Sequence, residues 1–319
     1  MLDLSIVIVN WNSKEFLRQC LKSVSELTDG LAYEVIVIDS GSFDGAGDLI
    51  AAEFQHVLFI QSQENVGFAR ANNEAYRRAR GSKILFLNPD TELINSAIGT
   101  MYEFLDSHAD AGAVGCKLLN GDGTVQTSCV QSFPTLLNQA LSAEALRAWL
   151  PNSTLWGMAA LYQGGHDPSP VDVISGACLM VRREAFEKVG FFSEEYFMYA
   201  EDLDLCYKLR RAGYVNYFVP RGVVKHFGGG STASAPSEFS LLMMRESIWR
   251  FLSKSRGSLY AAAYRATTAV AAIGRLSLLS ILWSIDRLRG RKHSHTQSMK
   301  KWLVILQWGI KAKTAAVPA

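Results

Sequence analysis

The sequence predicts an α/β fold with a mostly parallel central sheet, helices on both of its faces, and a helical appendage at the carboxyl end. Short β-branched runs, separated by amphipathic segments, recur along the first 118 residues. Strands that are apolar on both faces are typical of a parallel sheet that is covered on both sides. Charge divides the chain, because residues 1–240 hold 18 Lys/Arg and 28 Asp/Glu while 241–319 hold 14 and 2. The two parts, at −10 and +12, are expected to have different partners.

Each of the first three predicted strands ends at a loop that is rich in polar or small residues. In an open α/β sheet, ligands bind beyond the carboxyl ends of the strands, so these loops are expected to face one ligand. A loop-rich insert is predicted over 120–170, and a strand running into a helix over 171–186. The predicted strands are LSIVIV (4–9), EVIVID (34–39), VLFI (57–60), KILFL (83–87) and GAVGCKL (112–118).

Several function classes are excluded by missing motifs. No GxGxxG follows the first strand and no GxxxxGK[ST] occurs, so a nucleotide would be held by side chains at the strand ends. The five cysteines are scattered without a CxxC pair, which indicates neither a disulfide framework nor a zinc site and favours a reducing cytosol. The apolar run before Asn10 is too short for a signal-peptide core and is interpreted as the first strand.

The stretch FLNPDTEL (86–93) brings a carboxylate to the end of a buried strand. Pro89 cannot donate to a sheet ladder, so it ends the strand and leaves Asp90 at the sheet edge. A hard divalent cation bound through carboxylate and phosphate oxygens would suit Asp90. The alternative is an Asx-type turn that caps a helix beginning near Ile94.

The stretch YFMYAEDLDLCYKLRRAGY (196–214) places Glu201 and Asp202 at the start of an amphipathic helix. The helix dipole favours acidic residues in a first turn, which accounts for one of them. It does not readily account for Glu201, Asp202 and Asp204 together, directly after an aromatic cluster. A carboxylate walled by aromatic rings can serve as a general base, because partial desolvation raises its proton affinity.

The stretch VVKHFGGGST (223–232) offers a histidine followed by three glycines. The imidazole of His226 can complete a metal site begun by a carboxylate, and glycines let the backbone approach a phosphate closely. An ordinary loop histidine is the alternative.

Taken together and in this order, the motifs resemble glycosyltransferase family 2 of the GT-A fold, and within it a rhamnosyltransferase-like branch. The resemblance spans about 225 residues, which makes it specific although each piece alone is weak. The matching pieces are SIVIVNWNS (5–13), VIVIDSGSFDG (35–45), NVGFARANNEA (65–75), FLNPDTEL (86–93), GACLMVRREAFEKVGFFSEEYFMYAEDLDLCYKLRRAGY (176–214) and HFGGGS (226–231).

The resemblance implies a role for individual residues. Asp39 would read the nucleobase, Asp90 and His226 would bind a divalent cation (Mg²⁺ or Mn²⁺), and Asp202 would be the catalytic base, assisted by Glu201. Two positions depart from the family pattern: Asn88 replaces the first Asp of the DxD motif, and Ser40 stands where Asn or Asp is usual. The remaining implied donor-binding residues are Asn10, Asn12, Ser42, Asn65, Gly67, Arg70, Asn72, Asn73 and Asn88.

The resemblance also implies the reaction and the partners. The expected enzyme is an inverting hexosyltransferase in cell-surface polysaccharide synthesis, moving L-rhamnose from dTDP-rhamnose to a glycan or lipid-linked acceptor. The alternatives are a UDP-hexose donor, a sugar-nucleotide pyrophosphorylase, or a non-catalytic scaffold that retains the fold. No nucleic-acid partner is expected.

The expected domains are a GT-A catalytic domain over 1–235, with a nucleotide-sugar half to about 118 and an acceptor half from about 119, and a basic tail over 236–319. Arg265 and Arg275 interrupt the apolar segment 258–285, whose longest uncharged run covers only ten residues. A spanning helix needs about 20 apolar residues.

The tail is therefore interpreted as amphipathic helices that lie on the cytoplasmic face of the cell membrane, with Trp283 at the interface. The sequence KKWLVILQWGIKAK (300–313) repeats this arrangement. A helical appendage packed on the catalytic domain or on another subunit is the alternative. The cations expected to meet anionic headgroups are Arg287, Arg289, Arg291 and Lys292.

Overall fold

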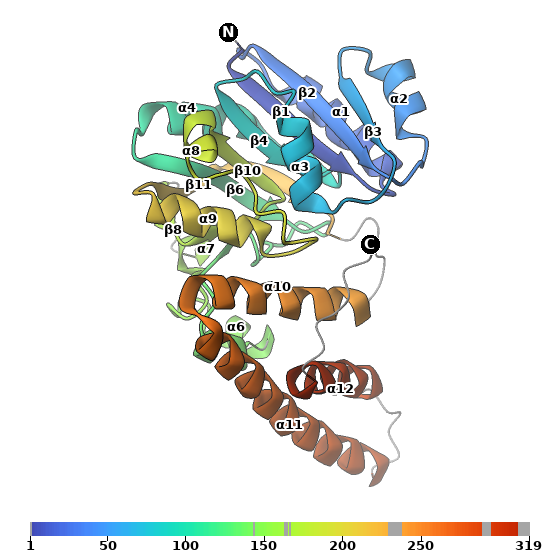
Figure 1. Cartoon of the computed structure of the whole chain (residues 1–319), viewed down its shortest axis with the longest axis vertical. Helices are drawn as coiled ribbons and strands as arrows, with labels where there is room; N and C mark the ends of the chain where they lie inside the picture. Colours follow the sequence, from blue (N-terminus) through green and yellow to red (C-terminus); the bar gives the residue numbers. More distant parts are fainter. Residues whose placement is uncertain are drawn as a thin grey trace. The chain divides into compact units, whose positions relative to one another are not determined.

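The computed structural model describes residues 2–142, 144–162, 165, 167–228, 238–288 and 295–311. The chain forms two compact units, which are drawn in Figure 1. The first unit combines Met1–Phe133 with Pro151–Ala233, and the second combines Pro134–Leu150 with Ser234–Ala319. The segment 134–150 thus belongs with the helical tail, although the sequence alone places it in the acceptor half.

The first unit is built on a mixed nine-stranded sheet in the order β3-β2-β1-β4-β10-β6-β11-β5, with β8 paired to β11. The strands β3, β2, β1 and β4 run parallel, whereas β10 is antiparallel to both of its neighbours and β5 is antiparallel to β11. The strands are β1 (Leu4–Asn10), β2 (Tyr33–Ser40), β3 (Leu58–Ser62), β4 (Lys83–Leu87), β5 (Thr91–Leu93), β6 (Ala111–Leu119), β8 (Ser169–Val171), β10 (Cys178–Arg182) and β11 (Val215–His226), beside a small ribbon of β7 (Val130–Gln131) and β9 (Val173–Ile174).

Helices cover both faces of this sheet (Figure 1). The connections through α1 and α2 move in one direction across the sheet while the connection through α3 returns, so right-handed crossovers place α3 on the opposite face. Every residue of β1 and β4 is buried, as expected for strands covered on both sides. The helices are α1 (Lys14–Leu27), α2 (Ala46–Glu53), α3 (Phe68–Tyr76), α4 (Ala97–Ser107), α7 (Ala159–Tyr162), α8 (Arg183–Lys188) and α9 (Glu201–Arg211).

The strand register aligns the polar ends that the sequence singles out. Asn10 at the end of β1 lies directly beside Asp39 on β2, and His226 at the end of β11 pairs with Thr91 on β5. The predicted α/β fold with a mostly parallel sheet is therefore confirmed, and its carboxyl-end edge collects residues from four motifs.

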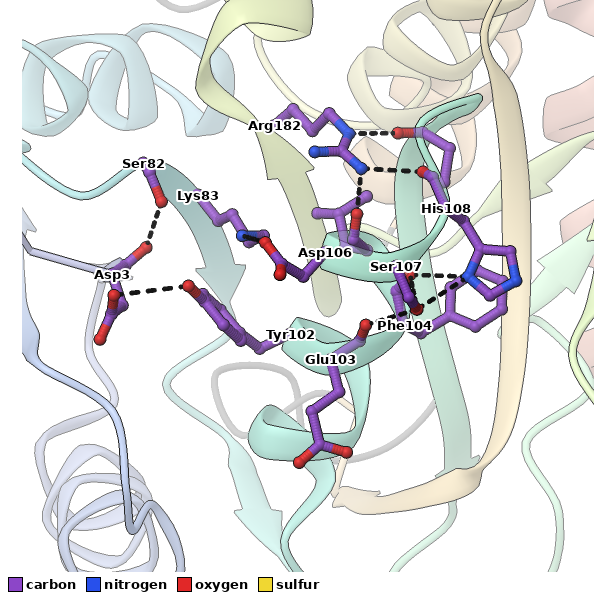
Figure 2. A network of polar contacts seen from close by, with 12 residues as sticks. Asp3, Ser82, Lys83, Tyr102, Glu103, Phe104, Asp106, Ser107, His108 and Arg182 are labelled. Carbon is purple, nitrogen blue, oxygen red and sulfur yellow. Dashed lines mark hydrogen bonds and ion pairs between the residues drawn. The ribbon is translucent and has the colours of Figure 1, made fainter.

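The amino-end edge of β4 is occupied by a polar network that anchors α4 (Figure 2). The buried Lys83 ammonium lies 2.7 Å from Oδ1 of Asp106 and 3.9 Å from the centroid of the Tyr102 ring. The guanidinium of Arg182 donates to the carbonyl oxygens of Leu105 and His108, where α4 ends. A cation at a helix carboxyl terminus satisfies free carbonyls and opposes the helix dipole, so this edge serves to hold the helix.

The second unit is helical, and its longest helix carries many exposed apolar side chains. Among the described residues, α11 is the one helix long and apolar enough to cross a membrane, and little of it is buried inside this unit. It packs against α10, α12 and α5. The helices are α5 (Leu136–Ala140), α6 (Glu144–Trp149), α10 (Glu238–Arg256), α11 (Ser258–Leu288) and α12 (Thr296–Ile310).

Candidate active site

Three polar side chains from two distant motifs meet beyond the end of β4. Oδ1 of Asp90 lies 3.3 Å from Nε2 of His226, and Nδ2 of Asn88 lies 3.3 Å from the same nitrogen. The pairing of β5 with β11, and the hydrogen bond from the Phe227 N–H to the Asp90 carbonyl at 3.0 Å, hold the two segments together. The helix that follows begins at Ala97, after the strand β5, so Asp90 does not cap it.

The histidine in this group is held by a residue that no motif predicts. Nδ1 of His226 lies 2.8 Å from Oε1 of Gln126, and an amide oxygen only accepts, so Nδ1 carries the proton. Nε2 of Gln126 donates to Oδ1 of Asn120 at 3.2 Å, which fixes the orientation of the amide. The lone pair on Nε2 of His226 therefore faces Asn88 and Asp90.

This arrangement suits a divalent cation. Nε2 of His226 accepts from Nδ2 of Asn88 and lies beside Oδ1 of Asp90, so a cation bound by the imidazole and the carboxylate would take the place of that Asn88 contact. The buried Oδ1 of Asn88 has no hydrogen-bond partner among the described residues. Carboxylate, amide oxygen and imidazole are ligands that Mg²⁺ or Mn²⁺ accepts. The described chain contains no group of three or more His, Cys, Asp or Glu that could hold a metal, so phosphate oxygens of a ligand would have to complete the coordination.

The predicted acidic pair opens α9, and its two members differ in environment. Asp202 is half-buried, and its carboxylate accepts from the N–H groups of Leu203 at 2.7 Å and Gly176 at 2.8 Å. Glu201 is buried, and its Oε2 has no hydrogen-bond partner among the described residues.

The two carboxyl groups accordingly ionise differently. Burial, and then the neighbouring charge of Asp202, raise the pKa of Glu201 to about 8. Burial also raises the pKa of Asp202, although the two backbone hydrogen bonds oppose that rise. At neutral pH, Glu201 holds its proton, while the backbone hydrogen bonds to Asp202 favour its ionised form.

The backbone that leads to this pair is strained. Tyr199 and Ala200 have φ values of 68° and 66°, in the left-handed region that residues with a side chain rarely adopt. Such residues cost on the order of 1–3 kcal/mol each and persist where the surroundings enforce them. Gly67 packs closely against the backbone just before this turn, because a Cβ there would lie 2.4 Å from the carbonyl oxygen of Phe197. The neighbouring Phe68 N–H donates to that oxygen at 2.9 Å.

One dipeptide connects the acidic pair with the Asp90 group. The Gly176 N–H donates to Asp202, while the carbonyl of the next residue, Ala177, accepts from the Asn88 N–H at 2.9 Å. Both groups therefore lie at the same end of the sheet, beside the start of β10.

At the ends of β1 and β2, the carboxylate of Asp39 is surrounded by donors. Its oxygens accept from Nδ2 of Asn10 at 2.7 Å, from Nε2 of Gln61 at 2.7 Å, from the Phe43 N–H at 3.1 Å, and from both the hydroxyl and the N–H of Ser42. Burial alone would raise the pKa of Asp39, but these hydrogen bonds outweigh it and lower the pKa. The carboxylate is ionised, and a nucleobase N–H would have to replace one of these donors.

The other predicted donor-binding residues have diverse environments. Oδ1 of Asn65 accepts from the Gly67 N–H at 3.0 Å, and Asn12 is exposed with φ of 49°. The amide of Asn73 bonds both the N–H and the carbonyl of Phe192. These contacts hold parts of the first unit together.

The next two predicted residues also make internal contacts. Asn72 donates to the Phe68 carbonyl in its own helix, and Arg70 lies 3.5 Å from Glu194. Of the predicted glycine segment, the residues Gly229, Gly230 and Ser231 lie outside the described residues.

Sequence comparisons identify relatives over most of the chain. The family described as glycosyl transferase family 2 matches residues 5–190, and glycosyl transferase family group 2 matches residues 128–286. The N-acetylglucosaminyl-diphospho-decaprenol L-rhamnosyltransferase of Mycobacterium tuberculosis is 30% identical over 305 residues, covering 91% of this chain and 96% of the relative. The rhamnosyltransferase WbbL of Escherichia coli is 26% identical, covering 79% of this chain and 93% of the relative.

Solved structures share the fold at low sequence identity. A mannosyltransferase from Pyrobaculum calidifontis in complex with GDP-Man and Mn²⁺ superposes with a TM-score of 0.58 at 15% identity, covering 97% of this chain and 88% of that one. GalNAc-T7 with UDP, GalNAc and Mn²⁺ also gives 0.58, at 14% identity, covering 97% of this chain and 56% of that one.

Proposed function

This chain belongs to glycosyl transferase family 2, and on that premise we propose that it transfers L-rhamnose from dTDP-rhamnose to a lipid-linked glycan acceptor, with inversion, during cell-surface polysaccharide synthesis. Two relatives are named as rhamnosyltransferases, and both are matched over more than nine-tenths of their own length. The acceptor in the mycobacterial relative's name is a polyprenyl-linked sugar diphosphate, and this supports a lipid-linked acceptor.

The donor would lie along the carboxyl ends of β1, β2 and β4. Asn10 and Asp39 would hold the nucleotide end, where a nucleobase N–H would take over an acceptor position on Asp39. Asn88, Asp90 and His226 would lie at the diphosphate. When bound there, a divalent cation would stabilise the charge that develops on the leaving diphosphate.

Asp202 would act from the other side of the sugar. Its carboxylate would take the proton of the acceptor hydroxyl as the acceptor oxygen bonds to the anomeric carbon, while the bond to the phosphate oxygen breaks and its electron pair leaves with the nucleoside diphosphate. Attack opposite to the leaving group inverts the anomeric centre. Glu201 would remain protonated and uncharged at neutral pH, so the pair would carry a single negative charge, on Asp202.

The observation that carries this assignment is the Gly176–Ala177 connection, because it brings the general-base candidate and the diphosphate candidate to one end of the sheet. The test is a donor panel assayed on the purified full chain with a polyprenyl-diphospho-GlcNAc acceptor and Mg²⁺ or Mn²⁺. Transfer from dTDP-rhamnose alone, with an inverted anomeric centre in the product, is expected. Preferential transfer from a UDP-hexose would show that dTDP-rhamnose is not the donor, although the enzyme would still be an inverting glycosyltransferase.

The site of action follows from the same proposal. Nucleotide sugars are soluble cytosolic donors and the acceptor is a lipid, so the enzyme would work at the cytoplasmic face of the cell membrane. The basic tail would provide peripheral attachment there. Its predicted cations Arg289, Arg291 and Lys292 lie outside the described residues.

A further inference from the structure

The helical unit has a charged group in its interior. The carboxylate of Glu246 is 1% exposed. One of its oxygens, Oε2, accepts from Nε1 of Trp308 at 3.2 Å and lies 3.4 Å from a guanidinium nitrogen of Arg265. That guanidinium lies over the rings of Trp308 and Trp249, with centroid distances of 4.7 Å and 5.2 Å. The positive charge of Arg265 is therefore directed into the helical unit.

The second arginine of α11 is directed inward in the same way. Arg275 donates to the carbonyl oxygens of Ala140 and Ser142, each at 3.0 Å, and its guanidinium lies 4.2 Å from the centroid of the Trp302 ring. The two arginines that interrupt the apolar sequence of α11 thus do not interrupt its outer surface.

The outer surface of α11 is uncharged from Leu259 to Ile285. Its exposed positions recur at helical spacing and are apolar or small, and they extend along about 40 Å of helix. Apolar patches of this extent are uncommon on soluble monomers and mark a binding surface. The large apolar residues on this surface are Leu259 (85% exposed), Val270 (69%), Ile273 (52%), Leu278 (56%), Ile281 (59%), Leu282 (38%) and Ile285 (37%).

Charge decides what covers this surface. Residues 241–319 contain only two acidic groups: Glu246 is buried, and Asp286 lies 3.2 Å from the His295 ring. The same segment contains 14 Lys/Arg, and its exposed cations include Arg287 and Lys300. A second copy would bring the same positive charge against this one and be repelled, whereas anionic headgroups around an apolar layer match both features.

We propose that α11 lies in the plane of an anionic membrane leaflet, with its Leu259–Ile285 face in the acyl boundary and Arg265 and Arg275 directed away from the lipid. The placement is in the plane because α12 packs along α11 and exposes Lys300 and Lys301, which a spanning α11 would carry into hydrocarbon. The inference deepens the membrane attachment of the proposed function and defines the face that contacts lipid.

The first experiment uses a label that reports its surroundings. All five native cysteines are buried, so a single introduced cysteine in the full chain can be labelled selectively. Ile273→Cys and Ile281→Cys would carry an environment-sensitive NBD group, and Gln297→Cys, an exposed position on α12, is the matched control.

Vesicles of phosphatidylcholine with phosphatidylglycerol should shift the emission at 273 and 281 to the blue and shield both labels from iodide, while the label at 297 stays aqueous. Labels at 273 and 281 that remain aqueous with these vesicles would overturn the proposal. So would labels that are already shielded without vesicles because the chain forms a dimer.

The second experiment separates attachment from chemistry. The double variant Ile273→Asp/Ile281→Asp should lose about tenfold or more of its partitioning to the anionic vesicles, because charges in the acyl boundary are costly. The control Gln297→Asp/Ser298→Asp, with the same change of charge on exposed α12 positions, should lose much less.

Transfer to a short-chain, water-soluble acceptor should be unchanged in both variants. Unaltered partitioning of the α11 variant, with a native circular dichroism spectrum, would overturn the membrane face without affecting the proposed reaction. Absent transfer by the wild-type chain would overturn the reaction alone.

Discussion

Gln126 accepts a hydrogen bond from Nδ1 of His226 at 2.8 Å and thereby directs the unprotonated nitrogen of the ring toward Asp90. In metal sites, a hydrogen bond of this kind fixes the tautomer and the orientation of the histidine that binds the metal. Under the proposed function, Gln126 would support cation binding by orienting the ring of His226.

Replacing Gln126 by leucine should weaken Mn²⁺ binding in the presence of a nucleoside diphosphate by about 10- to 100-fold, because the imidazole loses its fixed orientation. Electron paramagnetic resonance of free Mn²⁺ measures this directly, without turnover. Gln131→Leu, on β7, is the control. Equal Mn²⁺ affinity in Gln126→Leu and the wild-type chain would remove Gln126 from the site.

Asp202→Asn should reduce the rate of transfer by about 10²- to 10⁴-fold, because an amide cannot accept the proton of the acceptor hydroxyl. Donor affinity should change little, since Asp202 bonds only backbone N–H groups among its described contacts. Calorimetric titration with the nucleotide and single-turnover kinetics separate the two quantities. Glu195→Gln, an exposed acid nearby, is the control, and turnover of Asp202→Asn at the wild-type rate would refute the role.

The raised pKa of Glu201 predicts a pH dependence of stability. Its usual value is 4.5 and its value in the folded chain is about 8, so between these limits the unfolded chain releases a proton that the folded chain keeps. The free energy of unfolding should be greatest below about pH 4.5, as far as this group contributes, and fall as pH rises toward about 8.

Glu201→Gln should flatten that dependence, because the amide stays neutral throughout. Denaturant titrations of both chains from pH 5 to 9 test it. Parallel pH profiles for the two chains would show that Glu201 does not hold its proton.

Gly67→Ala should lower the free energy of unfolding of the first unit by more than the strain of a positive φ at an alanine accounts for. The new Cβ would meet the Phe197 carbonyl oxygen at 2.4 Å, in addition to the cost of a positive φ. Gly213→Ala is a matched control, since φ is also positive there but nothing lies within 4 Å of the added atom.

The control should lose about 1–2 kcal/mol, and Gly67→Ala should lose more, together with transfer activity, because the contact supports the strained turn before Glu201. Equal losses in urea titrations of the two variants would mean that the loop moves aside freely.

The parts of the fold that follow local patterns could be predicted from the sequence. Strands such as 4–9 and 83–87 are apolar on both faces because both faces are covered. Their continuous apolar sequences, and the polar residues that end them, can therefore be recognised in the sequence alone. Asp90 and His226 could be named because each stands at a strand end within a recognisable motif. Their meeting depends on the antiparallel pairing of β5 with β11, which no local pattern specifies.

Residues that act through distant contacts could not be predicted. Gln126 lies in an irregular segment, 100 positions before its histidine, and Gln61 stands between a predicted strand and a predicted loop. Asn73 resembles a donor ligand by its motif, yet its amide bonds the backbone of Phe192. In the sequence, Arg265 interrupts an apolar segment. Only the structure shows that its guanidinium bonds the buried carboxylate of Glu246, 19 positions earlier.

The Gly176–Ala177 dipeptide restricts how this chain can change over evolutionary time. Adjacent residues bond the side chain of Asp202 and the backbone of Asn88, so a shift that moves one of these groups also displaces the other. Under the proposed function, new sugar or acceptor preferences would therefore arise in the surrounding loops, while this short peptide would stay unchanged.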